Sequence, residues 1–313
     1  MKISFLMAAN NEENIISKPL ENFKKIHDIN KNIEFLIGLD GCTDNTLMII
    51  KNYKFVKYLD LKGRNGKPFV INKLMKIAKG NIIIIHDSDW IFNVENKYKI
   101  TELKNEFKDK KLGGIAESYP IEYIPKELNK IKSIGHLGTL WGNYFWMDFQ
   151  KKNYAYKENN RLYVRFSNKN FPFLVNIFRK EFYNENITLG DDFERSLDIL
   201  KKGYKVLIKE DENFPRMIAA YSKTRLKDIA KQKERTALAR DQIFKKYKIK
   251  INVFNFYIPL LFHSFKNLNK INNLKGRFAF FVWLITFLFG TLKNKLKLKE
   301  RSTKEGWLMR VKR

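Results

Sequence analysis

Two aspartates, Asp87 and Asp89, directly follow a run of four isoleucines, and their position suggests a site for a metal and a phosphate. Consecutive apolar residues describe a strand that is buried on both faces, and in an open parallel sheet ligands bind beyond the carboxyl ends of the strands. Side chains two residues apart on an extended chain point to the same side, and paired carboxylates offer hard oxygen ligands to Mg²⁺ or Mn²⁺. Such a pair alone also fits a helix cap or a solvated turn.

Other charged residues follow predicted strands or open predicted helices, where they would lie on the same rim of the sheet. Asp40 comes at the end of a strand expected over residues 33–39, and Lys67 follows a third strand. Asp191 and Asp192 open a further predicted helix. Each residue also has a plain structural interpretation, since Asp192 could only cap its helix and Lys67 could be a solvated charge. The hypothesis of a functional site therefore depends on these residues as a set and on their order along the chain.

The elements that would position these residues alternate between strand and helix. Strands are expected over residues 2–8, 33–39, 55–61, 82–86, 113–119 and 204–208, and helices over about 15–29, 68–78, 97–111, 191–202 and 223–247. Short strand–helix alternation favours right-handed crossovers. We therefore predict an α/β fold with a mostly parallel central sheet and helices on both faces.

Composition narrows the class of protein. The chain has 313 residues, of which 44% are hydrophobic, so a disordered protein is excluded. Cys42 is the only cysteine and no apolar leader follows Met1, so we expect neither an intrachain disulfide nor a signal peptide and predict a reducing compartment. A formal charge of +28 attracts polyanions. With no basic helix or ribonucleoprotein motif, we expect an anionic membrane surface and no nucleic acid as partner.

The last part of the chain differs in character, and we place a boundary between residues 1–245 and a helical segment at 246–313. Residues 278–292 are apolar around the whole circumference of a helix and have basic flanks. A fifteen-residue helix is about 22 Å long, shorter than a bilayer core of about 30 Å. We expect a helix in the membrane interface, with lysines on anionic headgroups. The alternative is a buried C-terminal helix of the main domain.

Taken together, these loops resemble the family 2 glycosyltransferases, nucleotide-sugar enzymes with the Rossmann-like GT-A fold, over roughly residues 2–240. The matching segments, in order, are Ala8-Ala9-Asn10-Asn11-Glu12, Asp40-Gly41-Cys42-Thr43-Asp44-Asn45-Thr46, Gly66-Lys67, Asp87-Ser88-Asp89, Asp191-Asp192 and Gln232-Lys233-Glu234-Arg235-Thr236. Thr236 replaces the Trp that commonly shapes the acceptor site in the family. We therefore expect a different acceptor from that of the processive polysaccharide synthases.

The resemblance implies transfer of a sugar from a nucleoside diphosphate to an acceptor hydroxyl, with inversion at the anomeric carbon. It implies that Asp89, with Asp87, coordinates a divalent metal, Mn²⁺ or Mg²⁺, and that Asp192 is the general base. We expect the start of its helix to favour the ionised carboxylate of Asp192. The resemblance also assigns the donor nucleotide to Ala8, Asn10, Glu12, Asp40, Lys67, Asp87 and Arg235, and the acceptor or diphosphate side to Asp191 and Gln232.

The expected partners are a UDP- or GDP-sugar as donor and a glycan or polyprenyl-linked acceptor. We expect the protein to be cytoplasmic and peripheral on the inner face of the cell membrane. One alternative is a nucleotidyltransferase with a similar sheet, although nucleotidyl transfer does not call for Asp191-Asp192 or for Gln232 and Arg235. The other is a basic scaffold for anionic lipid or nucleic acid, whose binding would fall steeply with salt and would not depend on a metal.

Overall fold

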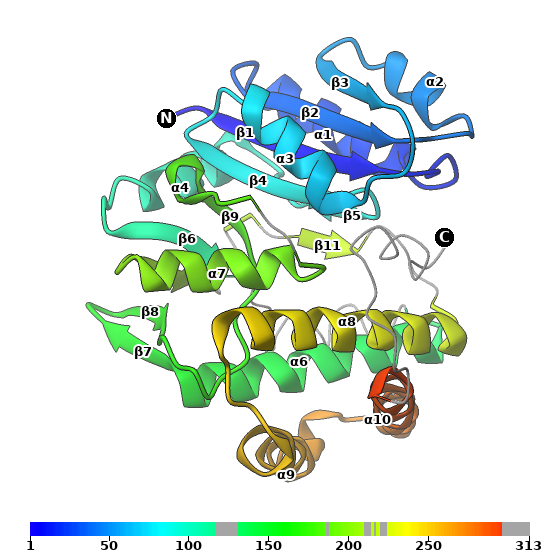
Figure 1. Ribbon diagram of the computed structural model, residues 1–313, viewed down its shortest axis with the longest axis vertical. Helices are drawn as coiled ribbons and strands as arrows, with labels where there is room; N and C mark the ends of the chain where they lie inside the picture. The colour runs from blue at the N-terminus through cyan, green and yellow to red at the C-terminus, as the bar shows by residue number, and fades with distance from the viewer. Residues whose placement is uncertain (117–130, 186–187, 210–213, 216, 220–223, 296–313) are drawn as a thin grey trace.

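The computed structural model describes residues 1–116, 131–185, 188–209, 214–215, 217–219 and 224–295. Its centre is a nine-stranded sheet, which occupies the upper and middle parts of Figure 1. The order of the strands is β3 (Val56–Leu61), β2 (Glu34–Asp40), β1 (Ile3–Ala9), β4 (Ile82–Asp87), β9 (Val175–Arg179), β6 (Leu112–Ala116), β10 (Lys205–Ile208), β8 (Arg161–Val164) and β7 (Ala155–Glu158). The first four strands pair in parallel, and β10 pairs in parallel with β6. The predicted α/β fold with a mostly parallel sheet is confirmed.

The strand β9 is the main departure from the predicted sheet. It runs antiparallel between β4 and β6, and thereby joins the N-terminal parallel strands to the rest of the sheet. It lies in a part of the chain where the sequence predicted no strand. The predicted strand at residues 113–119 is β6, which ends at Ala116, and residues 117–119 lie outside the described residues.

Helices cover both faces of the sheet because side chains in its strands alternate. In β1, Phe5 and Met7 face a core that they share with α1 (Ser17–Ile29), α2 (Thr46–Lys51) and α4 (Lys97–Glu106). Leu6 and Ala8 point the other way, into a core formed with α3 (Lys67–Ile77) and α7 (Asp191–Lys201). The carboxyl ends of β1, β2 and β4 therefore meet at one edge, from which α3 also starts.

Most of the nine-stranded sheet lies above a layer of helices in Figure 1, whereas β7 and β8 lie beside these helices. The layer consists of α6 (Ile134–Tyr154), α8 (Leu226–Tyr247), α9 (Ile258–Lys266) and α10 (Leu274–Lys295), with a π-helical turn at Val253–Tyr257 and a short 3-10 turn at Leu268–Lys270. Another 3-10 turn, Lys180–Phe182, follows β9 and packs in the core of the sheet. Aromatic side chains of α6 and α10 share one core with Ile229 of α8. A small antiparallel pair, β5 (Trp90–Phe92) with β11 (Met217–Ala219), lies beside the end of β4.

Two glycines of α6 explain how closely α10 packs. A Cβ atom on Gly138 would come within 2.2 Å of the carbonyl oxygen of Ala279, and one on Gly142 within 2.4 Å of the indole of Trp283. Small residues at such spacing let two helices approach until backbone meets backbone or ring. The inner face of α10, formed by Ala279, Phe280, Trp283 and Phe287, is consequently buried.

The C-terminal segment thus combines the two alternatives that the sequence left open. Its inner face is part of the protein core, as expected for a buried helix. Its outer face remains exposed and apolar, with Phe278 60%, Ile285 68% and Phe289 60% accessible. Within the described residues, no helix combines the length and apolar character that crossing a membrane requires. The boundary near residue 245 and the contact with a membrane remain predictions.

Candidate active site

A cavity of about 250 Å³ lies between the end of β4, the start of α7 and the helices α6, α8 and α10. It brings together four residues that the sequence singled out: Asp87, Asp192, Gln232 and Arg235. They come from three elements that are far apart in the sequence, since Asp87 ends β4, Asp192 opens α7 and the other two lie on α8. The cavity is therefore the candidate active site.

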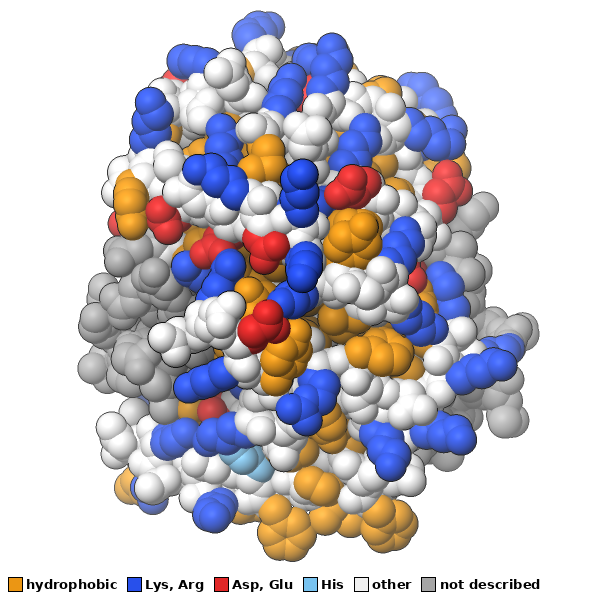
Figure 2. Space-filling model, turned by 90° about the vertical axis from the view of Figure 1, so that its left-hand side faces the viewer, with side chains coloured by type: hydrophobic (Ala, Val, Ile, Leu, Met, Phe, Trp, Pro, Cys, Tyr) orange, Lys and Arg blue, Asp and Glu red, His pale blue; other side chains and the backbone are white. Residues whose placement is uncertain are grey.

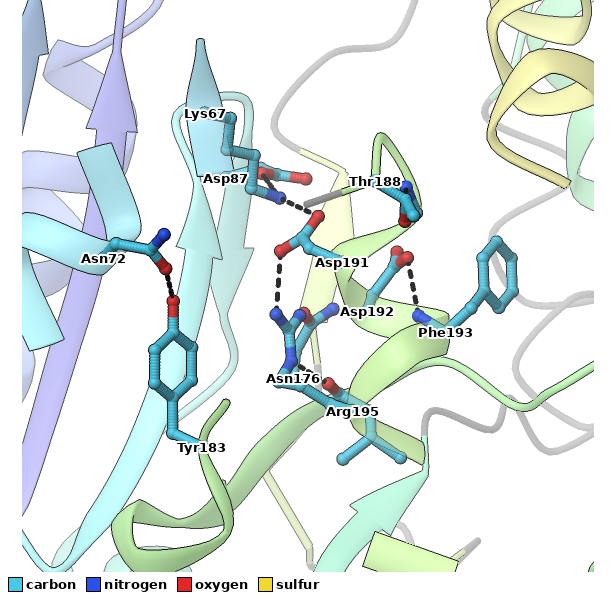
Figure 3. Close-up of polar contacts among 12 residues, drawn as sticks. Lys67, Asn72, Asp87, Asn176, Tyr183, Thr188, Asp191, Asp192, Phe193 and Arg195 are labelled. Carbon is cyan, nitrogen blue, oxygen red and sulfur yellow. Dashed lines mark hydrogen bonds and ion pairs between the residues drawn. The ribbon is translucent and has the colours of Figure 1, made fainter. Parts of the chain in front are cut away.

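Lys67 connects this cavity to the predicted donor loops. Its ammonium nitrogen lies 2.9 Å from Oδ1 of Asp87 and 3.7 Å from Oδ1 of Asp191 (Figure 3). Burial alone would lower the pKa of this lysine, yet the carboxylates of Asp191, Asp87 and Asp192 outweigh it and raise that pKa. Lys67 is therefore a fixed positive charge beside the cavity.

The position of Lys67 depends on Asp40. The Asp40 carboxylate accepts hydrogen bonds from the backbone N–H of Asn65 at 2.8 Å and of Gly66 at 2.7 Å. Gly66 has a φ of 96°, which glycine adopts without a steric penalty, and α3 begins at the next residue. Asp40 thus anchors the loop that starts α3. Its side chain is fully buried, so the predicted contact with the nucleotide base, which stays a prediction, would require this loop to rearrange.

The other predicted donor residues lie beyond the end of β1 and make contacts within the protein. Ala8 is 4% exposed, and Asn10 donates a hydrogen bond from Nδ2 to the backbone oxygen of Asp40 at 2.6 Å. The backbone N–H of Glu12 donates to Oγ1 of Thr46 at 2.8 Å. These bonds hold the β1 and β2 loops together, and none of the three residues lines the cavity. Their roles in binding a nucleotide stay predictions.

Asp191 and Asp192 are neighbours in the sequence, but their carboxylates point to different sides (Figure 3). Asp191 is buried, and burial would raise its pKa, but Lys67 and the guanidinium group of Arg195 lower it instead. Burial, together with the negative charge of Asp191, raises the pKa of Asp192 to about 6. We expected the start of the helix to favour ionisation of Asp192, and this direction was wrong because burial and the adjacent carboxylate dominate.

Arg195 holds Asp191 in place and was not singled out from the sequence. Its side chain is 2% exposed, and its Nη1 donates to Oδ2 of Asp191 at 2.7 Å. Its Nε donates to the backbone oxygen of Val175 at 2.7 Å, and its Nη2 to Oδ1 of Asn176 at 2.6 Å. The four-residue spacing from Asp191 to Arg195 on one helix was the available signal. Arg195 is a positioning residue for the start of α7.

Asp89 lies in the turn between β4 and β5, with a partly exposed side chain. Because β4 ends at Asp87, the alternation that would place both carboxylates on one side does not extend to Asp89, which does not line the cavity. Among the residues that the structure describes, no three His, Cys, Asp or Glu side chains could hold a metal together. Two carboxylates at a strand end still fit Mn²⁺ or Mg²⁺, which commonly takes one or two carboxylates together with substrate phosphates.

The helical side of the cavity contains residues that the sequence did not mark as functional. Lys233 and Arg240 of α8 and Trp283 and Phe287 of α10 line it, together with Trp146 of α6. The sequence could have pointed to Lys233 and Arg240, because residues seven apart lie on one face of a helix. Nothing in the sequence indicated that α10 lines the cavity, because its packing depends on contacts with distant glycines.

Comparisons with known proteins agree with this geometry. The profile of Glycosyl transferase family 2 matches residues 4–185. The chain is 25% identical over 311 residues to the dolichyl N-acetyl-alpha-D-glucosaminyl phosphate 3-beta-D-2,3-diacetamido-2,3-dideoxy-beta-D-glucuronosyltransferase of Methanococcus voltae, a match that covers 95% of this chain and 89% of that protein. A shorter match, 32% identical over 93 residues, covers 28% of this chain and 20% of the beta-monoglucosyldiacylglycerol synthase of a Nostoc species.

A solved structure shows a similar fold over most of the chain. A mannosyltransferase from Pyrobaculum calidifontis, in complex with GDP-Man and Mn²⁺, superimposes with a TM-score of 0.54. The match covers 91% of this chain and 73% of that one, at 14% sequence identity. The likeness supports the GT-A architecture, and at this identity it is a statement about fold.

Proposed function

The chain belongs to Glycosyl transferase family 2 and is a glycosyltransferase, and on this premise we propose that it inverts the anomeric carbon with Asp192 as general base. The proposed reaction moves a sugar from a nucleoside-diphosphate sugar to an acceptor hydroxyl. The observation that carries the proposal is the difference in pKa between the two adjacent carboxylates at the start of α7. Asp191 is held ionised by cations, whereas the pKa of Asp192 is raised to about 6. A base is most effective when its pKa lies near the working pH.

The chemistry follows from the positions of these side chains. The acceptor hydroxyl gives its proton to the Asp192 carboxylate while its oxygen forms the new bond to the anomeric carbon. The bond from that carbon to the phosphate oxygen breaks, and its electron pair leaves with the nucleoside diphosphate. Lys67 and Arg235 supply positive charge for this leaving group. A divalent ion held by Asp89 and Asp87 would neutralise further charge on the diphosphate.

Replacing Asp89 with Ala should abolish metal-dependent binding of the nucleotide. A ligand that binds only the folded state, at a hundred times its Kd, adds about 2.7 kcal/mol of stability. We expect one family of nucleoside diphosphates to raise the Tm of the wild type with Mn²⁺ but not with EDTA, and to lose this shift in Asp89→Ala. Asp60→Ala is the matched control, because Asp60 is a partly exposed carboxylate of β3 that pairs with Lys62. A wild type that is folded but shifted by no nucleotide would contradict the proposal.

We further propose a lipid-linked acceptor and a peripheral position on the inner face of the cell membrane. Large apolar side chains remain exposed on the π-helical turn, α9 and α10: Phe254 79%, Phe262 72%, Phe265 47%, Phe278 60%, Ile285 68%, Leu288 46% and Phe289 60%. Figure 2 shows large hydrophobic side chains along the lower edge of the molecule, where Figure 1 places α9. Exposed Lys266 and Lys275 lie in the same segments. Apolar rings with neighbouring lysines suit an anionic membrane surface, and a relative named for a dolichyl phosphate substrate supports a lipid-linked acceptor.

Exchanging both Phe262 and Phe278 for Glu should weaken binding to anionic vesicles. The change removes exposed apolar area and adds repulsive charge, so we expect affinity to fall by about tenfold or more. Flotation with vesicles that contain an anionic lipid measures it. Met48→Glu is the control, because Met48 is 61% exposed on α2. Equal flotation of the double variant and the wild type would refute this membrane surface. Deleting the C-terminal segment is no substitute, since α10 is part of the core.

A further inference from the structure

Two positively charged side chains of α8, Lys233 and Arg240, are buried in the wall of the cavity. Lys233 is 8% exposed and Arg240 is 2% exposed. They are seven residues apart, about two helical turns, and so lie on the same face of the helix. Burying a positive charge is costly unless a partner or a ligand compensates for it. The burial of Lys233 in a cavity wall therefore requires an explanation.

The surroundings of Lys233 are aromatic. Its ammonium nitrogen lies 5.0 Å from the ring centroid of Trp283 and 5.9 Å from that of Phe287. No carboxylate of a described residue forms an ion pair with it, and burial together with the charge of Arg240 lowers the pKa of Lys233 to about 8. Such contacts with aromatic rings compensate for only part of the lost hydration. Among the described residues, Lys233 thus lacks the anion that usually accompanies a buried lysine.

Arg240 converges on the same ring as Lys233. Its guanidinium carbon lies 5.5 Å from the ring centroid of Phe287, and its Nη1 donates a hydrogen bond to the Tyr257 hydroxyl at 2.8 Å. Burial also lowers the pKa of Arg240, and a guanidinium group stays charged in proteins. Two cations that meet over one aromatic ring form a concave, positively charged subsite with apolar walls.

This subsite reaches the start of α7 through two aromatic rings. The ring of Phe171 lies 5.8 Å from the guanidinium carbon of Arg240 and 4.7 Å from the ring of Phe193, which directly follows Asp192. Lys67, by contrast, contacts Asp87 and Asp191. The start of α7 therefore has Lys67 beside Asp191, on the proposed donor side, and Arg240 beside the ring that contacts Phe193, which we assign to the acceptor.

We propose that Lys233 and Arg240 bind the phosphate group of the acceptor substrate, a sugar linked through phosphate to an isoprenoid lipid. The inference rests on the proposed function and specifies its acceptor. The linking phosphate is negatively charged and has strong acceptor oxygens, which match an ammonium and a guanidinium group. Trp283 and Phe287 offer an apolar wall for the adjoining hydrocarbon, on a helix whose outer face is apolar and exposed.

The test is Lys233→Met, compared with Lys231→Met as the matched control, because Lys231 is exposed on the same helix. Titration of the full chain would measure affinity for farnesyl phosphate, farnesol, and a nucleoside diphosphate with Mn²⁺. We expect Lys233→Met to lower the affinity for farnesyl phosphate by about tenfold and to leave the affinities for farnesol and for the nucleotide unchanged. We also expect its Tm to stay equal or rise, because a buried charge is removed.

Each outcome separates the subsite from the proposed function. Unchanged affinity of Lys233→Met for farnesyl phosphate would overturn the subsite. If the Tm of this variant also fell, Lys233 would be a structural residue. If Lys233→Met lost affinity for the nucleotide as much as for farnesyl phosphate, these cations would bind the donor, and the proposal would also be overturned. A wild type that binds farnesyl phosphate through Lys233 but binds no nucleotide would retain the subsite and reject the glycosyltransferase mechanism.

Discussion

Asp192→Asn should reduce the rate of sugar transfer by two to four orders of magnitude, on the scale of a lost general base, while donor affinity stays within about twofold. Asn has nearly the same shape as Asp but cannot take the proton from the acceptor hydroxyl. The fold should tolerate the change. Since burial raises the folded-state pKa of Asp192 from 3.8 to about 6, the ionised group costs stability near neutral pH, and a neutral side chain removes that cost. Steady-state transfer assays and nucleotide titration measure both quantities.

The pH profile distinguishes a base from a binding residue. For the wild type, kcat/KM should rise as the pH passes through about 6 and then level off, because only the ionised carboxylate of Asp192 accepts a proton. The residual activity of Asp192→Asn should lack this rise. Asp198→Asn, on the same helix and hydrogen-bonded to Tyr247, is the control and should keep the wild-type profile. Weakened donor binding with normal turnover in Asp192→Asn would rule out the base.

Arg195→Met should destabilise the fold by about 3–5 kcal/mol, the scale for removing one partner of a buried ion pair. The guanidinium group is almost fully buried, and its loss would leave the carboxylate of Asp191 and the carbonyl oxygen of Val175 without their donors. Lys67 still contacts Asp191, at 3.7 Å, so the loss should fall toward the lower end of this range. Urea unfolding followed by circular dichroism measures the free energy of unfolding.

Arg225→Met provides the comparison, because Arg225 also pairs with an aspartate three residues away but its side chain is 63% exposed. Its unfolding midpoint should shift less than that of Arg195→Met, because solvent and salt screen a largely exposed guanidinium group, even though the Asp228 side chain is only 7% exposed. A similar midpoint shift in both variants would mean that the fully buried pair contributes no more than a pair with one exposed partner. In that case Arg195 would not be the residue that fixes Asp191.

The sequence predicted those parts of the site that depend on local order. Buried strands, the turns after them and the acidic start of α7 all follow from neighbouring residues, so Asp87 and Asp192 were expected on one rim of the sheet. Gln232 and Arg235 were expected from the family resemblance, and all four residues line the cavity. The antiparallel insertion of β9 was not predicted, because its pairing joins segments that are far apart in the chain. Strand pairing of this kind depends on tertiary packing more than on local propensity.

The electrostatic details were harder to predict for a physical reason. In a chain with a formal charge of +28, one more lysine looks like a surface residue, and only the fold shows that Lys233 is buried. Likewise, the pKa of Asp192 depends on its burial and on the orientation of Asp191, neither of which the sequence states. The helix at 278–292 looked uniformly apolar because one face packs in the core and the other remains exposed.

Because α10 packs closely on Gly138 and Gly142, the order of synthesis decides when the cavity is completed. Proteins emerge from the ribosome N-terminal end first, and segments that fold early wait for later ones. The strands and loops of the donor side are complete long before Trp283 and Phe287 are made. A nascent or truncated chain would thus hold the nucleotide side of the cavity without its far wall. The cavity is completed only when one of the last helices docks, so use of the proposed acceptor subsite would depend on the chain having been translated through α10.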